Sequence, residues 1–352
     1  MENRAHNSIA NQDRKRSVKC VVWDLDNTLW DGILLEDKSV RLRTGVTEII
    51  KTLDERGILH SIASRNDAQV ALAKLSEFKL QKYFLYPQIN WNSKASSLES
   101  IAAAIGIRLE ALAFVDDDPF EREEIGFSHP AVLCIDAAQP DLMLTMPEFM
   151  PYRITEDSKL RRLMYLTDIS RKEAESIFVG PKEEFLATLE LVFSMWTARE
   201  DDLERAEELT VRTHQLNSSG KTYSLQELDQ FRQSDCHKLL IASLEDRFGS
   251  YGRIGLALLE FDEYVWTIKL LLMSCRVISR GVGTIMLGRI IEQAKEAGVV
   301  LRAEFVANER NRMMYITYKF AGFKELSRNG DFVLFENDLR QIQPTPAYVK
   351  IL

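Results

Sequence analysis

Strand-like and helix-like segments alternate along the first third of this 352-residue chain. Residues 19–24, 58–64 and 111–117 are apolar runs with the length of buried strands. Segments with helical spacing lie between them, at residues 44–57, 66–78 and 94–106. This alternation is typical of a parallel sheet with helices on both faces, so the sequence predicts an α/β domain over residues 18–140.

The pattern restarts near residue 185. Strand-like runs at 189–198, 251–277 and 300–306 alternate with helix-like segments at 199–216, 282–298 and 308–323. Because residues 251–277 hold two or three strands without a helix between them, we expect an antiparallel centre. The sequence therefore predicts a second α/β domain over residues 185–352.

Two further segments complete the predicted organisation. Residues 141–184 are predicted to be a connector, punctuated by prolines at its start and with one charged helix over residues 156–178. Residues 1–17 are polar and are predicted to be a flexible N-terminal arm.

Composition excludes several classes of protein. The net charge of -8 argues against general nucleic-acid binding, which requires clustered Lys and Arg. No apolar run is long enough to span a bilayer, and the polar N-terminus lacks the apolar core of a secretory signal. The four cysteines are widely and irregularly spaced, which argues against a zinc site and a disulfide framework. We therefore expect a cytoplasmic protein with no membrane or nucleic-acid partner.

Polar residues mark the ends of the predicted strands in the first domain. Asp24 and Asp26 follow the first strand, and Asp116 and Asp117 close a later one. Ser64 ends the second strand, and Lys94 opens a helix. Ligands of α/β sheets bind at the carboxyl ends of the strands. Carboxylates suit Mg²⁺ and a nucleophilic attack on phosphorus, and Lys and Ser can bind phosphate oxygens, so the set predicts phosphoryl transfer through an aspartyl intermediate.

In this order, "DLDNTLWDG", "SRND", Lys94 and "FVDDDPFERE" resemble the haloacid dehalogenase superfamily of phosphatases over about residues 19–136. The resemblance implies that Asp24 is the nucleophile and that Asp26 is the general acid/base, with a backbone carbonyl that meets Mg²⁺. It implies phosphate binding by Ser64, Lys94, Asn27 and Thr28, and a further Mg²⁺ ligand at Asp116 or Asp117. The alternative, a capped turn with solvated acidic pairs, would require all four motifs to coincide by chance.

Only about residues 30–43 separate the first motif from the next predicted helix. A segment this short leaves no room for a large cap domain. We therefore expect an open site that can accept a bulky or partly protein-borne substrate.

The second domain resembles GNAT-type acyltransferases. "NERNRMMYITYKFAGF" is similar to their last helix, and "SCRVISRGVGTIMLGRII" stands where they carry the loop that binds the coenzyme A (CoA) pyrophosphate at a helix N-terminus. Here that loop is Arg280-Gly281-Val282-Gly283, which is shorter than usual. Cys275 lies between an apolar strand and this loop. It is either a buried core cysteine or a thiolate nucleophile activated by Arg276, Arg280 and the helix N-terminus.

Together the two halves resemble the FkbH family over nearly the whole chain, through "DLDNTLWDG" and "FVDDDPFERE" in the first and "RTHQLN", "EDRFGSYGRIG" and "MSCRV" in the second. The resemblance implies a bifunctional phosphatase and glyceryl transferase of polyketide biosynthesis. Cys275 would take the glyceryl group of D-1,3-bisphosphoglycerate as a thioester, and the Asp24 site would remove the remaining phosphate. The group would then pass to the phosphopantetheine of a stand-alone acyl carrier protein.

Further residues are candidates for the transfer site. Thr213, Gln215 and Asn217 could bind glyceryl hydroxyls or pantetheine amides, and Asp246 could orient the thiol site. For His214 a surface or structural role is favoured over a general base. Two alternatives stay open: a Mg-dependent phosphatase fused to a CoA-dependent N-acyltransferase, and a second domain that only docks a carrier or another partner.

Overall fold

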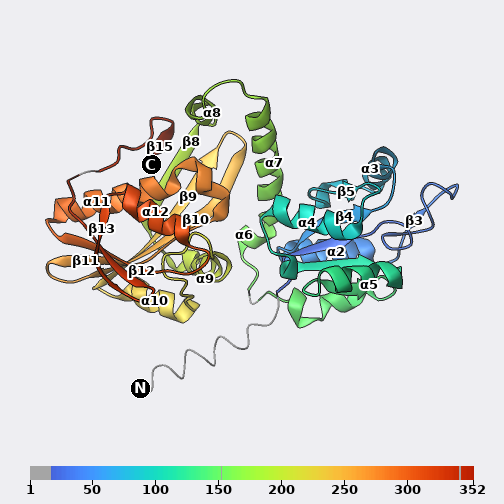
Figure 1. Ribbon diagram of the computed structural model, residues 1–352, viewed down its shortest axis with the longest axis horizontal. Coiled ribbons are helices and arrows are strands. Elements are labelled where there is room, and N and C mark those ends of the chain that lie inside the picture. The colour runs from blue at the N-terminus through green and yellow to red at the C-terminus, as the bar shows by residue number, and fades with distance from the viewer. Residues whose placement is uncertain (1–16, 152, 341) are drawn as a thin grey trace, which may run out of the picture. The chain divides into compact units, whose positions relative to one another are not determined.

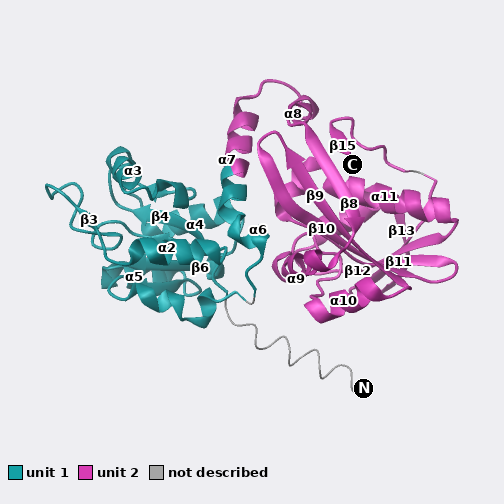
Figure 2. Cartoon of the chain, turned by 180° about the vertical axis from the view of Figure 1, so that it is seen from behind, with its two compact units in different colours: residues 1–166 teal, residues 167–352 magenta. Residues whose placement is uncertain are grey.

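A computed structural model describes residues 17–151, 153–340 and 342–352 of the chain. The predicted flexible arm lies, except for residue 17, outside these described residues. The chain divides into two compact units, Met1–Leu166 and Thr167–Leu352 (Figure 2). This division falls within the predicted connector, and the first unit continues past residue 140.

The first unit is built on a parallel sheet (Figure 1). Its strands are β1 (Cys20–Trp23), β4 (Leu59–Ser64), β5 (Gln88–Ile89), β6 (Leu112–Asp116) and β7 (Leu133–Asp136), in the spatial order β5-β4-β1-β6-β7. Its main helices are α2 (Val46–Glu55), α3 (Ala68–Glu77), α4 (Lys94–Ile105) and α5 (Pro119–Ser128). All the strand pairs of this sheet are parallel. The predicted strand–helix alternation is therefore confirmed.

The strand order reverses at β1. The chain moves from β1 through β4 to β5 on one side of the sheet, then returns through β6 to β7 on the other. Because crossovers between parallel strands are right-handed, α2 and α3 cover one face, and α4 and α5 cover the other. A reversal of this kind leaves a crevice at the carboxyl ends of the strands, and Asp24 is the residue after β1.

Only a small ribbon stands between β1 and α2. It consists of β2 (Trp30–Asp31) paired antiparallel with β3 (Arg41–Leu42). The expectation that no large cap domain is inserted here is therefore confirmed.

The connector differs from the prediction. Residues 156–178 were expected to form one helix, but the structure has α6 (Glu156–Lys159) and α7 (Arg161–Ile177), with Leu160 as the C-cap of α6. Arg161 and Arg162, at the start of α7, attach this segment to the first unit. Arg161 Nη1 donates to the carbonyl oxygen of Gly57 at 2.7 Å, and Arg162 Nε lies 2.9 Å from Asp54 Oδ1.

The second unit contains a mixed sheet. Its order is β13-β14-β12-β11-β10-β9-β8-β15, and the pairs β11–β12 and β8–β15 are parallel. The strands are β8 (Leu191–Thr197), β9 (His237–Asp246), β10 (Gly249–Phe261), β11 (Val265–Met273), β12 (Val300–Val306), β13 (Phe323–Asn329), β14 (Phe332–Asn337) and β15 (Val349–Ile351). The antiparallel centre, β9–β10–β11, is as predicted.

Helices cover both faces of this sheet, because apolar side chains along its central strands point alternately to one face and to the other. Leu239 and Ile241 pack with α9 (Leu203–Arg212) and α10 (Leu225–Gln233). Leu240 and Ala242, one residue along, pack with α11 (Val282–Ala297) and α12 (Arg312–Phe320). In the described part of the chain, no helix is long and apolar enough to cross a membrane.

Candidate functional site

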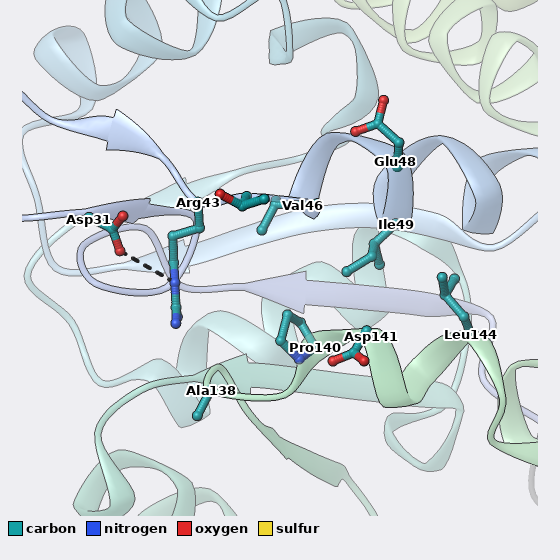
Figure 3. Close-up of a pocket in the computed structure, with 11 residues that line it drawn as sticks. Asp31, Arg43, Val46, Glu48, Ile49, Ala138, Pro140, Asp141 and Leu144 are labelled. Carbon is teal, nitrogen blue, oxygen red and sulfur yellow. Dashed lines mark ion pairs between the residues drawn. The ribbon is translucent and has the colours of Figure 1, made fainter.

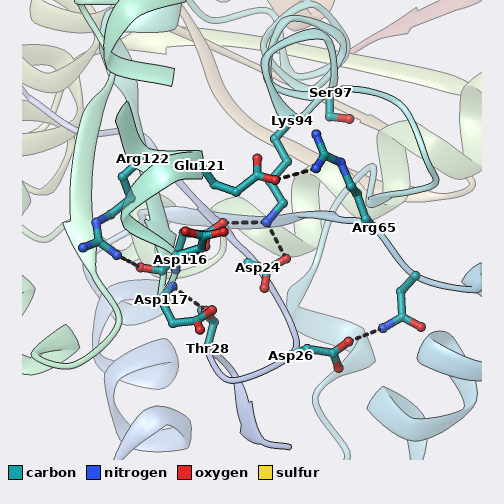
Figure 4. Close-up of polar contacts among 12 residues, drawn as sticks. Asp24, Asp26, Thr28, Arg65, Lys94, Ser97, Asp116, Asp117, Glu121 and Arg122 are labelled. Carbon is teal, nitrogen blue, oxygen red and sulfur yellow. Dashed lines mark hydrogen bonds and ion pairs between the residues drawn. The ribbon is translucent and has the colours of Figure 1, made fainter. Parts of the chain in front are cut away.

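A buried lysine joins two carboxylates at the carboxyl edge of the parallel sheet (Figure 4). Lys94 Nζ lies 3.0 Å from Asp24 Oδ1 and 2.6 Å from Asp116 Oδ2. The three residues are at most 6% exposed. Burial of three ionised groups is costly unless they pair, so this cluster points to a functional role or to a bound ion.

Each member stands where an element begins or ends. Asp24 follows β1, Asp116 ends β6 and Ser64 ends β4, which are neighbouring strands. Lys94 is the first residue of α4, whose N-cap Ser93 accepts a hydrogen bond from the backbone N–H of Ser96. Parallel strands bring their carboxyl ends to one edge, which is why residues far apart in sequence meet here.

The site perturbs the acidity of its members. The pKa of Asp24 is raised to about 7, because burial and, to a smaller extent, the charge of Asp116 outweigh the lowering effects of Lys94 and of a hydrogen bond from Ser64. Burial likewise raises the pKa of Asp116 against the opposing effect of Lys94. Burial lowers the pKa of Lys94, but the two carboxylates outweigh it and the net pKa is raised. Lys94 therefore stays charged between the two acids.

Two residues that the sequence analysis did not identify complete the cluster. Arg65 Nη1 lies 2.7 Å from Glu121 Oε1 (Figure 4). Glu121 Oε2 is buried and has no hydrogen-bond partner among the described residues. Burial raises the pKa of Glu121, and Lys94 and Arg65 oppose this shift. Arg65 is the residue after Ser64, and Glu121 lies in the first turn of the helix that follows Asp116. Their places beside two motifs are the sequence signal that could have identified them.

The donor set fits a divalent cation. One carboxylate oxygen each of Asp24, Asp116 and Asp117 lies within 4.8 Å of the others. Among the described residues, Lys94 and Arg65 are the basic side chains that act on these carboxylates, and one oxygen of Glu121 lacks a hydrogen-bond partner. Hard carboxylate oxygens with excess negative charge suit Mg²⁺. Both Asp116 and Asp117 remain possible ligands beside Asp24.

Asp26 is held beside the cluster by three donors. Its Oδ1 accepts from Trp30 Nε1 at 2.7 Å and from the backbone N–H of Leu34 at 3.0 Å. Its Oδ2 accepts from Asn66 Nδ2 at 2.9 Å. Trp30 and Leu34 belong to the ribbon segment, so the carboxylate of Asp26 ties this segment to the loop after β1.

The side chains of Asn27 and Thr28 make local contacts. Asn27 has a left-handed φ of 53°, and its Oδ1 accepts from the backbone N–H of Gly32 at 3.1 Å. Thr28 Oγ1 donates to Asp117 Oδ1 at 3.2 Å and accepts from the backbone N–H of Asp117 at 3.0 Å. These bonds fix the loop and join it to the end of β6. Direct phosphate binding by Thr28 would require rearrangement of its hydroxyl bonds, whereas the bond to Asn27 uses only its amide oxygen.

A cavity of about 550 Å³ lies next to this loop and not within the cluster (Figure 3). Its lining includes Arg43, the residues that open α2 and Asp141, and none of the cluster carboxylates. Arg43 Nη1 donates to the carbonyl oxygens of Asn27 at 3.0 Å and Ala137 at 2.7 Å. Arg43 thus links the cavity wall to the loop that carries Asp24 and Asp26.

Cys275 is exposed in the second unit. It is the first residue of a 3-10 helix, Cys275–Arg280, which follows β11 and precedes α11. The interpretation of Cys275 as a buried core cysteine is therefore wrong. Cys236 is also exposed, Cys134 is half-buried and Cys20 is buried, where burial raises the pKa of its thiol.

The two predicted arginine partners differ in environment. Arg276 Nη2 donates to the carbonyl oxygen of Tyr251 at 2.9 Å, which directs this side chain toward the β9–β10 hairpin. Arg280 is 4% exposed, and its Nε has no hydrogen-bond partner among the described residues. Arg280 Nη1 lies 3.5 Å from Glu175 Oε2.

Asp246 forms a buried ion pair. Arg171 Nε and Nη2 lie 2.7 and 2.9 Å from its two carboxylate oxygens. Tyr251 Oη donates to Asp246 Oδ2 at 2.9 Å, and the backbone N–H groups of Phe248 and Gly249 donate to Oδ1. Among the described residues, no hydrogen bond or ion pair joins Asp246 to Cys275. The hypothesis that Asp246 orients the thiol is not supported, because all its acceptor positions serve α7 and the hairpin.

The segment with Thr213, Gln215 and Asn217 lies beside the strand that leads to Cys275. The backbone N–H of Met273 donates to the carbonyl oxygen of Leu216 at 2.9 Å. Thr213 and Asn217 are buried, whereas Gln215 and His214 are exposed. Asn217 Oδ1 accepts from the backbone N–H groups of Ser219 and Gly220, so Asn217 shapes this turn. Gln215 is the exposed member of the three candidates.

Known proteins resemble parts of this chain. The N-terminal part of a Bacteroides fragilis protein, which contains a phosphatase domain and is complexed with Mg, is 24% identical, with a TM-score of 0.31. That similarity covers 46% of this chain and 42% of the other, so the chain spans less than half the length of that structure. No protein-family description and no curated protein matches the chain.

Two acetyltransferases also resemble part of the chain. The ribosomal-protein-S18-alanine N-acetyltransferase of Escherichia coli is 17% identical, with a TM-score of 0.34 over 41% of this chain and 92% of that one. An N-acetyltransferase of Staphylococcus aureus is 16% identical, with a TM-score of 0.32 over 42% and 99%. The architecture rests on the strand order described above, which confirms the predicted pair of α/β domains.

Proposed function

We propose that the first unit is a Mg-dependent phosphatase of the haloacid dehalogenase type. The observation that carries this proposal is Lys94, buried between the carboxylates that follow β1 and end β6, with Ser64 bonded to Asp24. A cation between two acids at the crevice of a parallel sheet suits a phosphate group, whose oxygens Lys94 and Ser64 can bind. Bound Mg²⁺, held by Asp24 with Asp116 or Asp117, would neutralise charge on the phosphate.

The residues support a two-step reaction. In the first step an oxygen of Asp24 attacks phosphorus, the bond from phosphorus to the substrate oxygen breaks, and Asp26 gives that oxygen its proton. In the second step water attacks the aspartyl phosphate, Asp26 takes a proton from this water, and phosphate leaves as the bond to Asp24 breaks. The role of Asp26 rests on the family resemblance, and its place next to Asp24 in the same loop supports it.

For the second unit we propose glyceryl transfer through Cys275. The thiolate attacks the acyl carbon of D-1,3-bisphosphoglycerate, a carbon–sulfur bond forms, and the C1 phosphate leaves. The thiol of a carrier protein's phosphopantetheine then attacks this thioester and releases Cys275. Exposure of Cys275 supports the proposal, because an acyl donor and a second protein must both reach the sulfur. The substrate and the carrier protein are those implied by the resemblance to the FkbH family.

A second candidate function is CoA-dependent N-acyl transfer. The observation that favours it is the start of α11, where Gly281 adopts a left-handed φ of 76° and no side chain among the described residues caps the helix. Free backbone N–H groups at the start of a helix can bind the pyrophosphate of CoA.

Intact mass spectrometry distinguishes the two functions. The full chain is incubated with Mg²⁺, D-1,3-bisphosphoglycerate and a phosphopantetheinylated acyl carrier protein. Glyceryl transfer predicts a glyceryl adduct on the carrier and release of phosphate from C3. If no carrier is acylated, whereas an amine is acetylated from acetyl-CoA, the second candidate replaces the first.

Two variants assign the chemistry to its residues. Asp24→Asn should stop phosphate release from C3, and Asp331→Asn, at an exposed position of the second unit, should not. Cys275→Ala should abolish the adduct on the carrier. Cys236→Ala is the matched control, because Cys236 is also exposed. Full carrier loading by Cys275→Ala would disprove the covalent cysteine mechanism.

A further inference from the structure

The start of α11 has the features of an anion-binding site. This helix of 16 residues has no acidic residue in its first turn, and no side chain in the described part of the chain caps it. Its first backbone N–H groups carry the positive end of the helix dipole. Arg280, the residue before the N-cap Gly281, is nine-tenths buried and has an Nε without a hydrogen-bond partner among the described residues. A diphosphate would be attracted to this end of the helix.

The C-terminal segment of the same unit runs along α11. The carbonyl oxygen of Gln343 faces Gly288 in the middle of the helix, and Pro346 and Tyr348 face Gly281 at its start. The segment therefore runs antiparallel to α11 and then continues into β15, which pairs with β8 (Figure 1). Pro344 and Pro346 restrict the backbone of this segment, which favours a fixed path.

Tyr348 lies beside the N-cap residue of α11. A Cβ atom placed on Gly281 would lie 3.2 Å from Tyr348 Oη and 3.7 Å from Pro346 Cγ. Burial raises the pKa of Tyr348, Glu183 raises it further and Arg280 lowers it, so both charges lie near enough to act on its hydroxyl. A diphosphate needs oxygens within about 3 Å of the first N–H groups of the helix. The hydroxyl of Tyr348 lies beside the N-cap residue Gly281, at the edge of that space.

We infer that Tyr348 is a specificity-determining residue, which closes the start of α11 to the diphosphate of CoA and leaves Cys275 to acceptors that carry no diphosphate. This inference rests on the proposed transfer to a carrier protein. Pantetheine on a carrier is joined to the protein through a single phosphate, whereas the pantetheine of CoA carries a nucleoside diphosphate. A closed helix start would thus distinguish the carrier protein from CoA, although both carry the same pantetheine thiol.

Isothermal titration of the full chain with CoA tests the inference. The wild type should bind CoA no more tightly than it binds pantetheine. Tyr348→Ala should lower the Kd for CoA by at least about tenfold, and its Kd for pantetheine should not change. Tyr348→Phe, which removes only the hydroxyl nearest Gly281, should give a smaller gain in the same direction. Tyr264→Ala is the control, because Tyr264 is 69% exposed in the turn between β10 and β11.

Three results would overturn the inference. The first is wild-type binding of CoA about tenfold tighter than of pantetheine, which needs no variant and no folding control. The second is a Tyr348→Ala protein, with an unchanged melting transition, that binds CoA no more tightly than Tyr264→Ala. The third is an equal gain in affinity for CoA and for pantetheine, which would mean that the C-terminal segment obstructs both ligands alike. A failure of glyceryl transfer itself would appear instead as an unmodified Cys275 in the mass-spectrometric assay.

Discussion

At the scale of single residues, Lys94 balances the charge of the proposed phosphatase site. Its ammonium group lies between Asp24 and Asp116, and it lowers the pKa of both carboxyl groups, which burial raises. Without this cation, the two buried acids would repel each other, and at least one of them would become protonated. Because the proposed nucleophile must be ionised, the lysine serves catalysis before any phosphate binds.

Replacement of Lys94 by Gln should therefore reduce phosphatase activity. We expect kcat to fall by about 10²–10³, as in other sites that lose one charge-stabilising donor. The pKa of Asp24 should rise, so the residual activity should increase with pH over a higher range than in the wild type. A pH–rate profile measures both effects. Lys51→Gln, on the exposed surface of α2, should behave like the wild type; equal activity of the Lys94 variant would contradict the assigned role.

At the scale of elements, His60 joins three parts of the first unit. Trp23 Nε1, on β1, donates to His60 Nδ1 at 3.1 Å, and His60 Nε2, on β4, lies 3.0 Å from the carbonyl oxygen of Ile50 on α2. The neutral tautomer with its proton on Nε2 satisfies both contacts. Burial lowers the pKa of His60 to about 3, against a raising effect of the hydrogen bond to Ile50.

The first unit should therefore lose stability as the pH falls. Below about pH 6.5 the unfolded chain binds a proton at His60, whereas the folded chain does not until about pH 3. The free energy of unfolding should fall by about 1.4 kcal/mol for each pH unit in this window from this group alone. Denaturant titrations at several pH values measure the slope. His60→Gln should be less stable at pH 7 but show a shallower slope, and the exposed His214→Gln should keep the wild-type slope.

Asp246 joins two elements of the second unit. Its carboxylate binds Arg171 of α7 and closes the β9–β10 hairpin, and both side chains are at most 1% exposed. Asp246→Ala should leave Arg171 buried without its partner, which costs about 3–5 kcal/mol of unfolding free energy. Chemical denaturation followed by circular dichroism measures this loss. Glu245→Ala, at the exposed neighbouring position, should change stability little; a stable Asp246 variant that fails only in transfer would restore the catalytic interpretation.

At the scale of the whole molecule, the two proposed reactions use separate residues. The carboxylate cluster lies entirely within Met1–Leu166, and Cys275 lies within Thr167–Leu352. The chemistry at Asp24 is expected to need Mg²⁺, whereas attack of a thiolate on an acyl phosphate does not. Removal of metal should therefore separate the two steps.

An excess of chelator should stop phosphate release from C3 but leave acylation of Cys275. The expected product is a phosphoglyceryl adduct on Cys275, which intact mass spectrometry distinguishes from the glyceryl adduct by the mass of one phosphate group. Chelator saturated beforehand with Mg²⁺ is the control and should leave both steps intact. Loss of Cys275 acylation under chelation would show that the two steps are not independent.

Local patterns were sufficient to predict the main elements and the four motifs of the proposed phosphatase site. Asp24, Ser64 and Asp116 were identifiable because each follows or ends an apolar strand, and Lys94 because it opens a helix after a capping serine. These features depend on neighbours in sequence. The partners of these residues do not, which is why Arg65 and Glu121 were not identified although both lie close to a motif.

Long-range contacts decided the remaining features. The residues next to Cys275 in sequence fit either a core cysteine or a nucleophile. Only the tertiary structure shows that Cys275 is exposed. Asp246 and Arg171 are 75 residues apart, so no local pattern could pair them. Likewise β15 and β8 are the last and first strands of the second unit in sequence. Their pairing places Tyr348 beside the start of α11. The sequence by itself therefore determined which segments are strands and helices and which strand ends carry acids, because periodicity and capping are local. Burial, pairing and access were decided only by the folded chain, because they depend on which distant segments pack together.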